Sequence, residues 1–171
     1  MDTRRAALLG MLVSLGVALH LLEAQLPTPL PWVRLGLANL VTLLAAVALG
    51  WRAALFVAVL RVVAGSLLAG GGFLGPGFIL ALGGGVAGAA VMGAMAPGAW
   101  RLWSPLGMSL AGAFAHGAAQ LALVAALLVR SREALLLAPW VLFPALASGA
   151  VTGVLANLLL LRWQARLGAA G

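Results

Sequence analysis

The hydrophobic positions of this chain form long runs, and the polar positions gather in the short breaks between them. A helix needs roughly 20 apolar residues, within a range of about 17 to 25, to cross the hydrocarbon core of a bilayer. The pattern therefore predicts an all-α integral membrane protein, a bundle of six transmembrane helices at approximately residues 6–26, 35–50, 53–69, 77–95, 106–129 and 135–161. Because the connections are short, we expect a single transmembrane domain over residues 1–171.

The composition of the chain excludes most other classes of protein. Hydrophobic residues make up 64% of it and charged residues 8%, whereas soluble domains are about 25% charged. So little polar surface excludes a soluble enzyme, and so much apolar surface excludes a disordered chain. The chain has no cysteine, which excludes a disulfide scaffold and thiol catalysis.

The charges predict the orientation of the bundle. All ten basic residues are arginines dispersed between the apolar runs, so we interpret the net charge of +7 as topology signals, not as a nucleic-acid site. With six spans, both termini lie on the same side of the membrane. That side also has six arginines, and the other side has three. They are Arg4, Arg5, Arg52, Arg101, Arg162 and Arg166 on the first side, and Arg34, Arg130 and Arg132 on the second. Because cytoplasmic loops carry the excess of basic residues, both termini are predicted to be cytoplasmic.

Small residues at helical spacing predict close packing between helices, since lipid supplies no hydrophobic force to hold helices together. Stripes interpreted as internal packing are Gly84 with Gly88, Gly149 with Gly153, and Gly107, Ala111, Ala115 and Ala119. A further stripe, in the first predicted helix, is the best candidate for a surface that docks onto another membrane protein. It consists of Ala6, Gly10, Ser14 and Ala18.

Few polar side chains lie inside the predicted spans, and each needs a reason because a charge at mid-bilayer costs a few kcal/mol on insertion scales. These candidate ligand-binding residues are His20, Glu23, Arg34, Asn39, Arg61, His116 and Gln120. In the predicted topology they map to the middle or the outer half of the membrane, which predicts a binding cavity open to the outside. We expect the guanidinium groups of Arg34 and Arg61 to contact a small anionic ligand, and the neutral polar groups to orient it.

The same residues also have a structural interpretation. Arg61 and Glu23 can neutralise one another inside the bundle. His116 and Gln120 share one face of a helix and can form hydrogen bonds to a neighbouring helix. The sequence leaves both interpretations open.

Catalysis by this chain alone is not expected. Prenyl transfer and most metal-assisted phosphate chemistry need clustered carboxylates to hold Mg²⁺. The three acidic residues of the chain, Asp2, Glu23 and Glu133, are far apart in the sequence. The chain also lacks a GxxxxGK[ST] phosphate loop. We therefore expect no catalytic residue, no metal site and no cofactor.

Residues 33–43, with the sequence VRLGLANLVTL, resemble the signature of a bacterial membrane family, called the Gx transporter or heptaprenyl diphosphate synthase component I family. Further matches follow in the same order along the chain: Arg61 with Gly65-Ser66-Leu67, Gly71-Gly72-Phe73-Leu74, Leu82-Gly83-Gly84, Gly112–His116 with Gln120, and Gly149–Gly153. The chain departs from the family at Arg34, where lysine is usual, and at Gly117, where asparagine is usual. The second departure removes a polar group from that part of the predicted site.

The resemblance implies a role in the bacterial cytoplasmic membrane. The family is similar in size and number of spans to the S-components of energy-coupling-factor transporters, which capture a small substrate near the outer side. Those proteins dock on a T-component and paired ATPases through small residues of the first helix, so by analogy the first-helix stripe is a docking surface. The family name implies an alternative, a noncatalytic membrane subunit that assists a soluble polyprenyl diphosphate synthase. A third hypothesis is a structural subunit of a membrane redox complex.

Overall fold

The computed structural model describes residues 2–25, 36–69 and 73–168, and helices are the regular structure within them. The long helices are α1 (Thr3–Gln25), α2 (Leu37–Leu49), α3 (Trp51–Leu68), α4 (Pro76–Met95), α5 (Pro105–Leu123) and α6 (Ala138–Gly168). Short helical turns join them at Ala96–Gly98, Val124–Leu128 and Arg132–Leu137. Of the described helices, five are long and apolar enough to cross a membrane, and α2 is shorter. The described chain is thus an all-helical bundle of the membrane type, as predicted.

Helix α2 is shorter than the predicted segment because a glycine with positive φ lies at each of its ends. Gly36 has a φ of 70° and Gly50 a φ of 91°, a backbone conformation that interrupts a right-handed helix and that glycine adopts at little cost. The helix between them has 13 residues, a length of about 20 Å.

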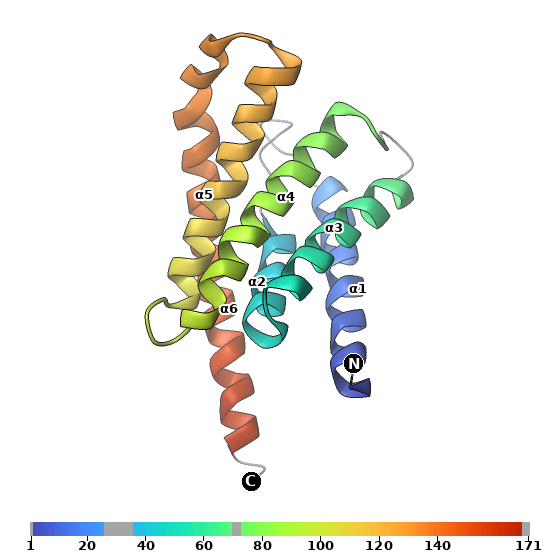
Figure 1. Ribbon diagram of the computed structural model, residues 1–171, viewed down its shortest axis with the longest axis vertical. Coiled ribbons are helices and arrows are strands. Elements are labelled where there is room, and N and C mark those ends of the chain that lie inside the picture. Colours follow the sequence, from blue (N-terminus) through green and yellow to red (C-terminus); the bar gives the residue numbers. More distant parts are fainter. Residues whose placement is uncertain (1, 26–35, 70–72, 169–171) are drawn as a thin grey trace.

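Helix α2 also lies at the centre of the bundle. It packs against each of the other five long helices, and the residues from Val41 to Ala46 are buried. A helix that is apolar on all sides belongs in the interior. Figure 1 shows α2 between α6 and α3 and behind α4, with the start of α1 and the end of α6 at the same end of the bundle.

The ends of the last two long helices differ from the predicted segments. The α-helical part of α5 ends at Leu123, and the next turn, Val124–Leu128, is π-helical. Helix α6 begins only at Ala138, after a 3-10 turn, and continues to Gly168. The predicted segment 135–161 thus includes the last part of the 3-10 turn and omits the end of α6.

Two of the predicted glycine pairs form close contacts with α5. A Cβ atom on Gly88 would lie 3.0 Å from the carbonyl oxygen of Gly112, and one on Gly149 would lie 2.6 Å from Cβ of Ala113. Beside the second contact, Ser109 Oγ donates a hydrogen bond of 2.7 Å to the carbonyl oxygen of Gly149. These pairs therefore hold α4 and α6 closely against α5, which agrees with internal packing.

The small-residue stripe of α1 faces away from the bundle. Gly10, Ser14 and Ala18 are exposed and Ala6 is half-buried. A Cβ atom on Gly10 would meet no atom within 4 Å. The opposite face of α1 makes the internal contacts instead, through the buried residues Leu12, Gly16, His20 and Glu23.

Candidate functional site

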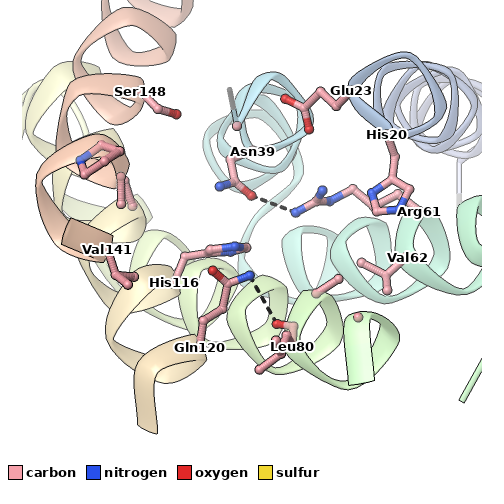
Figure 2. A pocket seen from close by; sticks show the side chains of 16 residues that line it. His20, Glu23, Asn39, Arg61, Val62, Leu80, His116, Gln120, Val141 and Ser148 are labelled. Carbon is pink, nitrogen blue, oxygen red and sulfur yellow. Dashed lines mark hydrogen bonds between the residues drawn. The ribbon is translucent and has the colours of Figure 1, made fainter. Parts of the chain in front are cut away.

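A cavity of about 270 Å³ lies between the helices. Its lining includes His20 and Glu23 near the end of α1, so the cavity is remote from the start of that helix. Each of the six long helices contributes to its lining. Its polar side chains are those of His20, Glu23, Asn39, Arg61, His116, Gln120 and Ser148. Figure 2 shows that these side chains approach one hollow from several sides, with Arg61 and Asn39 opposite His116 and Gln120.

The pocket brings together six of the seven residues that the sequence singles out as a candidate ligand site, namely His20, Glu23, Asn39, Arg61, His116 and Gln120. Arg34 lies outside the described residues. Residues as far apart in sequence as His20 and Gln120 thus share one cavity.

Arg61 is the buried cationic group of the pocket. It lies in the middle of α3, and its side chain is only 4% exposed. Its Nη2 donates a hydrogen bond of 2.7 Å to Oδ1 of Asn39 on α2. The neutral amide of Asn39 thus holds the guanidinium group in place. The NH2 group of the same amide is directed toward the hollow (Figure 2).

Glu23 has a structural role that the sequence does not predict. Its Oε1 accepts a hydrogen bond from the backbone N–H of Leu37, the first residue of α2. Gly36 precedes this helix and has no side chain to cap it, so the Glu23 carboxylate supplies the cap and is favourably placed at the positive end of the helix. Glu23 therefore anchors the end of α1 to the start of α2 at the edge of the pocket.

His116 and Gln120 occupy one face of α5, one turn apart, and both are half-buried. Gln120 Nε2 donates a hydrogen bond of 3.5 Å to the carbonyl oxygen of Leu80 on α4. The structural interpretation of Gln120, as a tie between two helices, thus describes part of its role. Both side chains nevertheless line the hollow.

Glycines make the room that two of the pocket side chains occupy. A Cβ atom on Gly84 would lie 2.9 Å from Cε1 and Nε2 of His116, and one on Gly65 would overlap the ring of His20. Such distances require the imidazole to move, because real Cβ atoms do not approach other atoms so closely. Gly65 and Gly84 therefore position the two histidines from the neighbouring helices.

The sequence alone does not mark Gly65 and Gly84, which make room for pocket side chains, or Ser148, which lines the pocket. Gly84 belongs to a GxxxG pair, a motif that predicts packing alone, whereas in the structure it both packs and makes room for His116. Ser148 of α6 lines the pocket and lies close to Gly36. Ser148 lies among small and apolar residues in the sequence. Nothing in that context distinguishes it from a serine that only packs helices together.

Replacing Gly84 with alanine is expected to displace His116 from the pocket. The added methyl group would lie 2.9 Å from the imidazole, and overpacking of this kind typically costs about 1–3 kcal/mol. Thermal unfolding in detergent and the NMR signal of the His116 ring measure the two effects. Gly77→Ala is the matched control, because Gly77 also lines the pocket but a Cβ atom there would meet nothing within 4 Å. Equal behaviour of the two variants would contradict the role given to Gly84.

Within the described residues, histidine and carboxylate side chains form no group of three that could hold a metal ion. The groups that line this pocket, one guanidinium, two imidazoles, two amides, a carboxylate and a hydroxyl, offer hydrogen bonds and charge.

The fold and the pocket define a class, an all-helical protein of the membrane type with a polar cavity enclosed by its helices. Residues 12–159 match the model of the family described as heptaprenyl diphosphate synthase component I. The chain belongs to this family, which confirms the resemblance that residues 33–43 and the later motifs suggest. No curated protein and no solved structure matches the chain.

Proposed function

We propose that this chain is a multi-pass protein of the bacterial cytoplasmic membrane that captures a small anionic molecule from the outer side, in the manner of an S-component. The observation that carries the proposal is the convergence of Arg61, Asn39 and His116, from three different helices, on one cavity. Polar groups inside a membrane bundle are costly, so their collection around a hollow favours a ligand site.

The chemistry of the pocket favours a carboxylate or a phosphate as the group that is recognised. A guanidinium presents planar donors that match both anions. The amide of Asn39 and the hydroxyl of Ser148 add neutral hydrogen-bonding groups on the lining. The volume of about 270 Å³ lies just below the roughly 300–1,000 Å³ of pockets for drug-sized ligands, which favours a smaller molecule.

The distribution of basic and aromatic residues supports an outward-facing pocket. The described and exposed arginines number five on the predicted cytoplasmic side (Arg4, Arg5, Arg52, Arg101 and Arg162) against two on the other (Arg130 and Arg132). Trp51, Trp100, Trp103 and Trp163 are exposed in the same predicted boundary regions, as is typical of membrane interfaces. Both termini are then cytoplasmic, and the pocket lies in the other half of the bundle.

Uptake of the captured molecule requires partners. The stripe of Ala6, Gly10, Ser14 and Ala18 is the surface proposed for a T-component, which would act with paired ATPases. Two observations support this docking surface. Most of the stripe faces away from the bundle, and small residues allow another membrane helix to approach closely. Surrounding membrane lipid is the other expected partner, and no nucleic acid is involved. We propose no catalytic activity, metal or cofactor for this chain.

The family match favours a second candidate function. The description of the matched family names a component of a heptaprenyl diphosphate synthase, so this chain is alternatively a noncatalytic membrane subunit that assists a soluble polyprenyl diphosphate synthase. In that case the partner is the soluble synthase, and the pocket need not hold a transported molecule.

Native mass spectrometry of mildly solubilised protein tests both functions. We expect a small molecule to co-purify with the wild-type chain, and His116→Ala to reduce its retention about tenfold, the effect of one lost hydrogen bond. Phe114→Ala is the matched control, because Phe114 lies on the same helix and is exposed. If no small molecule is bound and the activity of a prenyl synthase depends on this chain, the second function is correct.

A further inference from the structure

A second hollow lies at the other end of the molecule. It is a groove of about 350 Å³ where α1 begins and α6 nears its end. Arg4 and Arg5 of α1 and Trp163 of α6 line it, together with apolar residues that include Leu8 and Leu160. None of its lining residues is shared with the polar pocket.

The groove exists because α2 is short. Figure 1 shows that α1 and α6 extend beyond the end of α2 at this end of the bundle. The last residues of α2, Val47–Leu49, line the groove, so it lies where α2 no longer fills the space between its neighbours.

The lining changes from charged to apolar along α1. Arg4 and Arg5 are exposed, whereas Leu8, one turn further along the helix, is half-buried. Leu8 and Val47 pack against a buried cluster that includes Leu160, so the apolar part of the groove is continuous with the core of the bundle. A ligand that fits this lining has an anionic group at one end and an apolar chain at the other.

We propose that this groove binds one anionic phospholipid, with its phosphate on Arg4 and Arg5 and an acyl chain against Leu8 and Leu160. Guanidinium groups form strong charge-assisted hydrogen bonds with phosphate oxygens. Basic pockets between transmembrane helices on the cytoplasmic side are typical sites for lipid headgroups. Trp163 is 37% exposed and suits the headgroup depth, where tryptophan is enriched. This site is separate from the proposed small-molecule function and does not depend on it.

The test uses the delipidated full-length protein and added phosphatidylglycerol, with binding followed by native mass spectrometry. We expect one tightly retained lipid, and about 30-fold weaker retention in the double variant Arg4→Ala/Arg5→Ala. Arg4→Lys/Arg5→Lys, which keeps both charges, is expected to retain most of the binding. Arg52→Ala/Arg101→Ala is the matched control. It removes the same charge from exposed arginines that do not line the groove, and it is expected to bind lipid as the wild type does.

Three results would overturn the proposal. Equal loss in the Arg52→Ala/Arg101→Ala control would show diffuse attraction to a basic surface. Equal retention of zwitterionic phosphatidylcholine would show that the anionic charge is not recognised. Retention of a prenyl diphosphate or of inorganic phosphate, but not of phosphatidylglycerol, would assign the groove to another phosphate compound. Circular dichroism of each variant verifies that the helices are intact before binding is compared.

Discussion

Replacing Arg61 with methionine is expected to weaken retention of the proposed small anionic ligand by about 30-fold or more while leaving the bundle folded. Losing the buried charged group that contacts an anion costs about 2–5 kcal/mol, or roughly 30- to 5,000-fold in affinity. Arg61 is 4% exposed, and methionine is an unbranched, adaptable apolar side chain that fills most of the buried space the arginine vacates. Native mass spectrometry measures the retained ligand, and thermal unfolding measures the fold.

Two further variants sharpen this experiment. Arg61→Lys keeps the positive charge but lacks the planar group that donates to Asn39, so intermediate retention is expected. Arg101→Met removes an exposed arginine outside the pocket and is expected to change nothing. Full retention of the ligand in Arg61→Met would instead support the structural interpretation of Arg61.

Replacing Gly149 with leucine is expected to separate α6 from α5 and to unfold that half of the bundle. Even a Cβ atom at this position would lie 2.6 Å from Cβ of Ala113 and 3.2 Å from the backbone oxygen of Ser109. The backbone cannot move away without breaking the hydrogen bond between Ser109 and the Gly149 carbonyl. We expect a loss of about 3 kcal/mol or more in the free energy of unfolding, at or above the upper end of overpacking costs.

Ala147→Leu is the matched control for this prediction. Ala147 lies two residues earlier on the same helix and is exposed, so a leucine there contacts lipid and should leave the unfolding temperature unchanged. Because Ser148 of the pocket immediately precedes Gly149, the Gly149→Leu variant should also lose the proposed ligand. A stable Gly149→Leu protein would show that α5 and α6 are not held as closely as this contact requires.

The sequence by itself determined the helical membrane class, the family and six of the seven polar residues that line the pocket. Each of these follows from local properties. The length of an apolar run determines whether a helix can cross the bilayer. The free-energy cost of placing a polar group inside the membrane depends on the residue itself, however its helix packs. Hence Asn39, Arg61 and His116 stand out in the sequence before any contact between them is known.

Only the tertiary structure decided which of these residues meet and what each one contacts. The Glu23 carboxylate caps α2 because the end of α1 lies beside Leu37, a placement that helical periodicity does not contain. Glycine has no side chain to signal its surroundings, so Gly84 is recognised as making room for His116 only once α4 and α5 are packed together. Which small-residue stripe is buried and which faces outward likewise depends on how the helices rotate against one another, since lipid and helix interior are nearly equally apolar.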